Sequence, residues 1–155
     1  MQKRTRRFGL TPIGYVNRRS DIEDIKNRDL ISEIIISPDL VEALDGIEEF
    51  SHLYIIFWMH KISNTEKKML KVHPRGRSDM PLRGVFATRT PRRPNSIGLT
   101  LVQLLNVNKN VLTIRGLDAF HGTPVLDIKP FDSWDLTEDY KVPKWLVKLE
   151  EERKV

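Results

Sequence analysis

Short apolar runs separated by turn-forming residues are the feature that most limits what this chain can fold into. Some seven of these runs are rich in Val, Ile, Leu and Phe and have the length of β-strands, whereas few stretches show helical periodicity. This pattern predicts a mainly β domain, a barrel or a sandwich, with a few short helices. The expected strands are 11–16, 31–36, 51–60, 83–88, 97–105, 111–115 and 125–129.

Two segments carry helix signals. Residues 38–44 open with a proline, which suits the first turn of a helix, and Gly46 follows their end. Residues 143–154 also open with a proline and are expected to form a C-terminal helix. The apolar stripe of this helix would consist of Trp145, Leu146 and Leu149.

The expected strand at 51–60 shows the clearest alternation of faces. The side chains predicted to enter the core are Leu53, Ile55, Phe57 and Met59. The opposite face mixes aromatic groups with His52 and His60. Histidines at both ends of an aromatic face suit a ligand-binding surface, but a core can also absorb them. Both interpretations are open for His60, and the core is favoured for His52.

The length of 155 residues fits one domain, which we expect to span residues 11–155 after a mobile basic tail at 1–10. There are no cysteines, which fits a cytoplasmic location. No apolar run approaches the ~20 residues that span a bilayer, and the basic start lacks the apolar stretch of a secretory signal. The four histidines lack metal-ligand spacing, so no metal is expected.

Positive charge is concentrated in two stretches of the chain. The net charge is +5; residues 1–7 hold four lysines and arginines, and residues 71–93 hold seven against Asp79 alone. Such clustering is the electrostatic footprint expected of a nucleic-acid-binding protein. A solvated basic face remains the alternative, although the predominance of arginine favours contact with phosphate.

A stiff basic loop at 89–96 connects two of the expected strands. It contains Arg89, Arg92 and Arg93 together with Pro91 and Pro94, and proline restricts both itself and the residue before it. Guanidinium groups held in this way suit phosphate, carboxylate or the face of a base. An ordinary basic turn is the alternative interpretation.

Common enzyme fingerprints do not occur in this sequence. There is no G-x-G-x-x-G, no P-loop lysine motif and no G-x-S-x-G. The usual nucleotide-binding and serine hydrolase classes are therefore unsupported.

Three motifs occur in order along the chain: HPRG, GVFATRTPRRPNSIGLT and LDAFHGTPVLDIKPF. With them the sequence resembles the TsaA-like family, whose best understood members are the TrmO-type tRNA methyltransferases, from about Pro12 to Phe131. The resemblance implies a compact β-barrel-like domain that forms a homodimer. It also implies S-adenosylmethionine-dependent N6-methylation of threonylcarbamoyl-adenosine next to the anticodon of tRNA.

The same resemblance implies a set of site residues. Contacts to the methyl donor would come from His60, Lys61, Arg89, Leu99, His121, Gly122, Thr123 and Pro124. Arg89 would pair with the donor carboxylate, and Leu99 and the turn at 121–124 would enclose the adenosine. This assignment suits methyl transfer, because the sulfonium is already reactive and the protein mainly aligns donor and acceptor.

Other residues are candidates for the acceptor and for proton removal. Arg92 and Arg93 could read the carboxylate of the modified base, and Arg75 and Arg77 could bind backbone phosphate. Asp127 is a candidate catalytic base, although pairing with Lys129 is the simpler interpretation. Phe131, two residues further on, is expected to pack rather than to stack on a base.

The chain also departs from the family pattern. The Pro-Arg-Gln run of bacterial members has no equivalent in residues 17–29, His121 replaces an aspartate, Ser96 replaces a proline, and the C-terminal region is short. Two alternative functions therefore stay open. One is a methyltransferase with another RNA or a small-molecule acceptor, and the other is a non-catalytic donor-sensing or RNA-binding module.

Overall fold

The computed structural model describes residues 8–18 and 25–153. Its contacts divide the chain into two compact units. The barrel unit consists of residues 1–60 and 97–131, and the second unit consists of residues 61–96 and 132–155. The predicted tail falls largely on residues 1–7, which lie outside the described residues, as do residues 19–24 of the loop in which the Pro-Arg-Gln run is missing.

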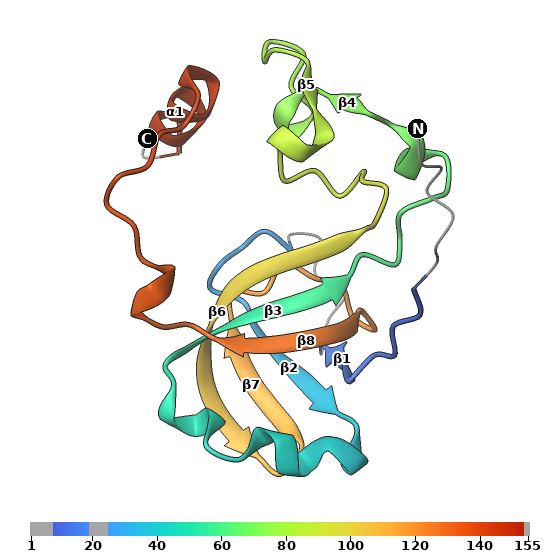
Figure 1. Ribbon diagram of the computed structural model, residues 1–155, viewed down its shortest axis with the longest axis vertical. Helices are drawn as coiled ribbons and strands as arrows, with labels where there is room; N and C mark the ends of the chain where they lie inside the picture. Colours follow the sequence, from blue (N-terminus) through green and yellow to red (C-terminus); the bar gives the residue numbers. More distant parts are fainter. Residues whose placement is uncertain (1–7, 19–24, 154–155) are drawn as a thin grey trace. The chain divides into compact units, whose positions relative to one another are not determined.

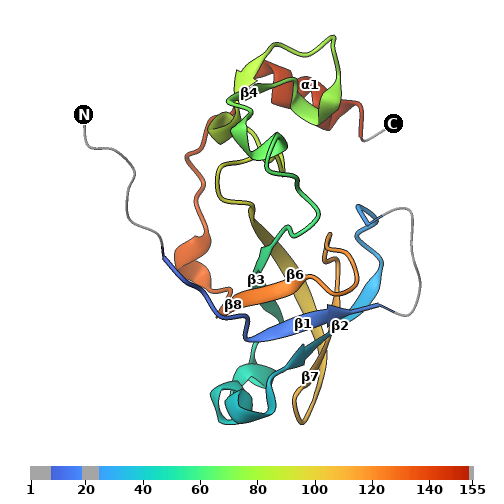
Figure 2. The same cartoon turned by 90° about the vertical axis from the view of Figure 1, so that its right-hand side faces the viewer.

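Six strands in the described part of the chain close the barrel, and every adjacent pair is antiparallel (Figure 1). Their order around the barrel is β1-β2-β7-β6-β3-β8, so that β1 lies between β2 and β8 (Figure 2). The strands are β1 (Gly14–Asn17), β2 (Ile31–Ile36), β3 (His52–Trp58), β6 (Ile97–Asn108), β7 (Val111–Arg115) and β8 (Pro124–Pro130). The predicted barrel is confirmed.

Alternation along the strands builds the core of the barrel. Leu53, Ile55 and Phe57 of β3 are buried, as predicted, and Met59 is partly buried against the core. Gly98 belongs to the inward row of β6. A side-chain carbon at this position would overlap with the Phe57 ring. A glycine therefore lets the large ring fill the barrel interior.

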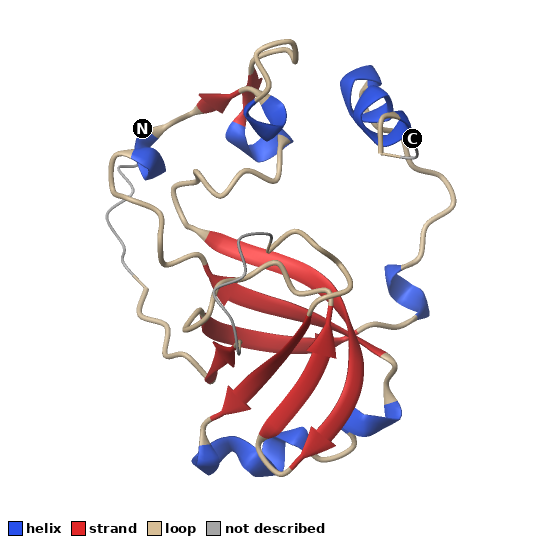
Figure 3. Cartoon of the chain, turned by 180° about the vertical axis from the view of Figure 1, so that it is seen from behind, coloured by secondary structure: helices blue, strands red, loops and turns tan. Residues whose placement is uncertain are grey.

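The predicted helix at 38–44 forms as a 3-10 helix. This segment, η1 (Pro38–Leu44), is followed by η2 (Ile47–Glu49), and both cross one end of the barrel (Figure 3). Pro38 occupies the first turn, and Leu44 is buried in the barrel core. The segment thereby covers apolar side chains at that end of the barrel.

Among its described residues, the second unit contains short elements and one α-helix. Its two-stranded sheet pairs β4 (Lys71–Val72) with β5 (Arg83–Gly84). The helix α1 (Lys144–Glu151) buries Leu149 and half-buries Trp145 and Leu146, as the predicted stripe requires. Its 3-10 turns are η3 (Glu66–Lys68), η4 (Pro74–Gly76), η5 (Val85–Ala87) and η6 (Ser133–Asp135).

The expected strand at 83–88 is correct only for its first two residues. Val85 donates its backbone N–H to Leu70 O at 3.0 Å and is buried. Thr88 N–H then donates to Val85 O at 3.2 Å, which closes the 3-10 turn η5. The strand therefore ends earlier than the apolar run suggests, because the backbone makes one more strand-like hydrogen bond, at Val85, and then closes into a turn.

Within the described residues, no helix is long and apolar enough to cross a membrane. The same part of the chain holds no group of three or more His, Cys, Asp or Glu side chains placed to bind a metal ion.

Candidate functional site

The turn from His121 to Pro124 joins the barrel through backbone hydrogen bonds. Gly122 has φ of 74°, a conformation that favours glycine, and its N–H donates to Val16 O at 2.8 Å. Val16 N–H in turn donates to Thr123 O at 3.0 Å. The sequence Gly-Thr therefore fixes this turn against the end of β1.

The turn also meets the end of β3. The Thr123 side chain is buried, and its Oγ1 lies 3.5 Å from Nδ1 of His60, which follows β3. Two parts of the predicted donor site that are 63 residues apart in the sequence thus lie in contact. His60 itself is exposed.

A buried arginine supports the turn from the other side. Arg18 is 7% exposed; its Nε donates to Ser32 Oγ at 2.9 Å, and its Nη2 donates to Leu117 O. Its backbone N–H donates to Nδ1 of His121 at 3.2 Å, so this nitrogen must be an acceptor. Burial lowers the pKa of Arg18, and the nearby Asp118 carboxylate opposes that shift.

Sequence reasoning missed Arg18. The residue lies at the start of a polar stretch of mixed charge, and arginine is seldom buried. No signal in the sequence separates it from the neighbouring arginine at position 19.

An apolar cavity of about 290 Å³ lies beside the turn in the barrel unit. Pro124 belongs both to the predicted donor site and to the cavity wall. The lining consists of Phe8, Leu10, Pro12, Trp58, Pro124 and Leu126. Apolar walls of this kind suit a flat, weakly polar group such as a nucleobase.

Leu99 and Asp127 lie in one row across three neighbouring strands. Leu99 of β6 and Asp127 of β8 are both paired in register with Ile56, which lies on β3 between them. The Leu99 side chain is 48% exposed, on the outer face of the barrel. The Asp127 carboxylate lies 3.0 Å from Lys129 Nζ and accepts the N–H of Ile128, in line with the simpler interpretation of this aspartate.

Phe131 packs, as expected, against the outer face of β3. Its ring lies edge-on to Tyr54 with 5.9 Å between centroids and to His52 with 6.4 Å. The aromatic face predicted for β3 therefore contacts the end of β8.

Lys61 and Arg89 belong to the second unit, and both are exposed. Arg89 follows η5, in the loop that the sequence predicts to be stiff. The predicted contacts of Lys61 and Arg89 with the donor stay predictions.

The four arginines proposed to bind RNA differ in their surroundings. Arg77 donates to Asp79 and to Glu152, and Arg92 Nε donates to Glu66 Oε1 at 3.2 Å. Arg93 donates to backbone carbonyl groups of its own loop. Arg75 is exposed and has φ of 56°.

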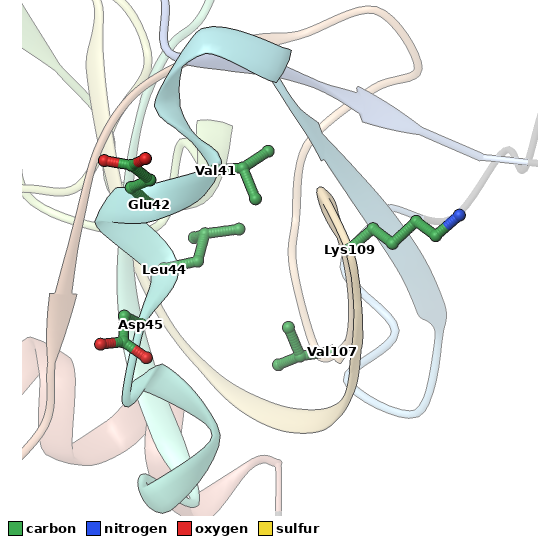
Figure 4. A pocket seen from close by; sticks show the side chains of 6 residues that line it. All are labelled: Val41, Glu42, Leu44, Asp45, Val107 and Lys109. Carbon is green, nitrogen blue, oxygen red and sulfur yellow. The ribbon is translucent and has the colours of Figure 1, made fainter.

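A second, more open cavity of about 580 Å³ lies at the end of the barrel that η1 crosses (Figure 4). Its lining includes none of the predicted site residues. The side chains of Val41, Leu44 and Val107 point toward it (Figure 4). The full lining is Val41, Glu42, Leu44, Asp45, Val107 and Lys109.

Residues 20–135 match the model of the tRNA-methyltransferase O N-terminal domain family. The chain belongs to this family. A relative from Methanocaldococcus jannaschii, described as a probable S-adenosyl-L-methionine-binding protein, is 42% identical over 125 residues, which cover 80% of this chain and 92% of the relative. The human tRNA (adenine(37)-N6)-methyltransferase is 48% identical over 89 residues, 57% of this chain but 20% of the human protein.

Solved structures of the family share the fold. The crystal structure of TrmO from P. aeruginosa superposes with a TM-score of 0.71 and 28% identity, over 92% of this chain and 63% of that chain. A further TrmO structure gives a TM-score of 0.69 and 33% identity, over 88% of this chain and 64% of that chain. The chain therefore spans less than two thirds of the length of these solved proteins.

Proposed function

We propose that this chain binds S-adenosyl-L-methionine and transfers its methyl group to tRNA. The acceptor would be N6 of threonylcarbamoyl-adenosine next to the anticodon, and the protein would act as a cytoplasmic homodimer. The observation that carries the proposal is the apolar cavity whose wall Pro124 shares with the turn at 121–124, beside the contact between Thr123 and His60. These features supply an apolar slot for adenine next to polar groups.

The relatives support the proposed donor binding and the proposed tRNA acceptor to different extents. The relative described as a probable S-adenosyl-L-methionine-binding protein is covered over 92% of its length. The relative named for methylation of tRNA adenine 37 is covered over 20%. Donor binding is thus supported over most of a relative's length, and the acceptor rests on a shorter match.

Each group has a defined task in this proposal. The donor supplies a methyl group activated by its sulfonium. Arg89 pairs with the donor's carboxylate, and Leu99 and the 121–124 turn enclose its adenosine. Lys61 and His60 also contact the donor. The N6–methyl bond forms as the sulfur–methyl bond breaks, and N6 loses its proton, with Asp127 as the candidate acceptor. Alignment of the donor's methyl group in line with N6 accelerates the transfer.

The decisive experiment measures transfer of labelled methyl from S-adenosylmethionine to tRNA with and without the threonylcarbamoyl group. The tRNA is then digested to nucleosides, and the product is identified by mass. Label only on the modified adenosine is the expected result. Donor binding without label on either tRNA contradicts the proposed acceptor.

Arg89 provides the first residue-level test. Arg89→Ala should weaken donor binding at least about tenfold, because a charge-assisted bond contributes ~1.5–3 kcal/mol, and should abolish transfer. The control is Arg83→Ala, which removes an exposed arginine whose Nη1 donates to Leu82 O. Isothermal titration with the donor checks both variants, and unchanged donor affinity in Arg89→Ala refutes the assigned role.

A non-catalytic donor-binding module is the second candidate function. The naming of the relatives favours it, because the one covered over 92% of its length is described by binding alone. This candidate would be selected if the protein binds both the donor and RNA, and no RNA is labelled in the methyl-transfer experiment.

A further inference from the structure

Phe86 is a largely exposed aromatic residue in an ordered turn. Its side chain is 78% exposed, whereas the preceding Val85 is 2% exposed. Both lie in η5, which follows the strand pair β4 and β5 (Figure 1). Burial of Val85 anchors the turn and leaves the Phe86 ring on the surface.

Arg93 holds the turn that presents Phe86. Its Nη1 donates to Thr88 O at 2.9 Å, Thr90 O at 3.1 Å and Val85 O at 3.3 Å. The guanidinium carbon lies 5.8 Å from the centroid of the Phe86 ring. One side of the ring is therefore occupied by a cation, and little side-chain freedom is left to lose when a ligand binds the other side.

The segment that contains Phe86 carries positive charge. Segment 61–96 holds ten lysines and arginines, against Glu66 and Asp79 as its acidic residues. Lys71 and Arg83, on the two strands before η5, are exposed, and so is Arg89 after it. An exposed ring among exposed cations is the arrangement used to bind single-stranded nucleic acid, in which cations follow the phosphates and rings stack on the bases.

We propose that the open face of Phe86 stacks on an unpaired base of the RNA substrate. The base, the Phe86 ring and the Arg93 guanidinium would then form three consecutive layers. The inference rests on the proposed RNA substrate, but it concerns RNA binding and not methyl transfer. It gives Arg93 a positioning role in place of the predicted contact with the carboxylate of the modified base.

RNA accounts for this surface better than a protein partner. Leu70, whose carbonyl accepts the Val85 N–H, is 70% exposed and adds apolar area. A second copy of this chain could bring either its own basic segment or the rest of the chain, which holds sixteen basic and nineteen acidic residues and so offers little negative charge. Because the surrounding charge is positive, a polyanion is favoured.

The test uses the whole chain of 155 residues and an anticodon stem–loop RNA that carries 2-aminopurine at an unpaired position. Fluorescence anisotropy gives the RNA affinity, and 2-aminopurine quenching reports stacking. Phe86→Leu should weaken RNA binding about fivefold to a hundredfold and abolish quenching. Phe86→Trp should retain both, because it keeps a flat aromatic face.

The matched control is Trp134→Leu. Trp134 is 93% exposed, but it lies between Asp132 and Asp135, where RNA phosphate is repelled. This variant should bind RNA like the wild type. Donor affinity and thermal midpoint, measured on all variants, should be unchanged in Phe86→Leu.

Several results would overturn the inference. One is wild-type RNA affinity and quenching in Phe86→Leu, and another is the absence of binding of any unpaired RNA by the wild type. A change from dimer to monomer in Phe86→Leu, by analytical ultracentrifugation, with RNA affinity retained would assign the ring to a second copy of the chain. RNA binding through Phe86 without methyl transfer would contradict the proposed enzyme and leave this inference standing.

Discussion

At the scale of single residues, two arginines of the central loop have different partners. Arg93 donates to three carbonyl groups of residues 85–90, whereas Arg92 donates to the Glu66 carboxylate. The pKa of Glu66 is lowered, first by bonds from Ser63 and then by Arg92. Arg93 therefore stabilises the loop, and Arg92 forms an exposed ion pair whose contribution to stability is small.

Replacement of Arg93 should open the loop. Arg93→Met keeps the apolar stem and removes the donor, so the carbonyl groups of Val85, Thr88 and Thr90 lose their shared partner. Trypsin cleavage after Arg89, followed by mass spectrometry, should accelerate about tenfold or more. Arg92→Met is the control and should leave that rate unchanged. Equal rates in the two variants would show that Arg93 does not stabilise the loop.

Gly98 should be intolerant of a larger side chain. Gly98→Ala places a methyl group where the Phe57 ring lies, and such overpacking costs ~1–3 kcal/mol. Urea denaturation checks the free energy of unfolding. The cost should be smaller in a Phe57→Leu background, as a double-mutant cycle would show. Gly84→Ala is the control, since the nearest atom to its added carbon is 4.0 Å away; an equal loss there would refute the argument.

At the scale of elements, an ion-pair network attaches α1 to the segment after η4. Arg77 donates to Asp79 through Nη2 at 2.6 Å and through Nε at 2.9 Å, and also to Glu152, which follows α1. Lys148 Nζ lies 3.6 Å from Asp79. The Arg77 hydrogen bonds lower the pKa of Asp79 to about 2 and lower that of Glu152 as well.

Attachment of α1 should weaken in acid. Because the pKa of Asp79 is lower in the folded state than in the unfolded state, its contribution is complete above ~pH 4 and is lost as pH falls through about 2. Amide chemical shifts of α1, followed by NMR during acid titration, should change in this window. Asp79→Asn should reduce that step, Asp79→Asn combined with Glu152→Gln should remove it, and Glu151→Gln, the control, should retain it. An identical titration in Asp79→Asn would exclude the network as the cause.

The same scale shows what the sequence can and cannot predict. The run at 31–36 forms a strand with those bounds, because a segment rich in β-branched residues suits a barrel wall. The apolar run at 85–87 forms a turn, since its backbone finds one strand partner at Leu70 and then closes on itself. The motif at 121–124 predicts a turn, whereas burial of Arg18 depends on tertiary partners that no local pattern encodes.

At the scale of the whole molecule, charge is divided unevenly along the chain. Segment 61–96 holds ten basic and two acidic residues, and the rest of the chain holds sixteen basic and nineteen acidic residues. The net charge of +5 therefore understates the positive potential of one segment and overstates that of the rest. We expect RNA affinity to fall steeply with salt and donor affinity to change little.

Arg75 and Arg77 should contribute unequally to that salt dependence. Each phosphate contact to single-stranded RNA adds ~0.7 to the slope of log affinity against log salt. Arg77 is engaged by Asp79 and Glu152, whereas Arg75 is exposed. Arg75→Ala should therefore flatten the slope by about 0.7, and Arg77→Ala should change it little.

Anisotropy titrations of an anticodon stem–loop at several salt concentrations measure the slopes. The control is Arg115→Ala, which removes an exposed barrel arginine that donates to Gln103. An unchanged slope in Arg75→Ala would exclude it from the RNA contact, and equal flattening by both variants would mean that RNA displaces the carboxylates from Arg77.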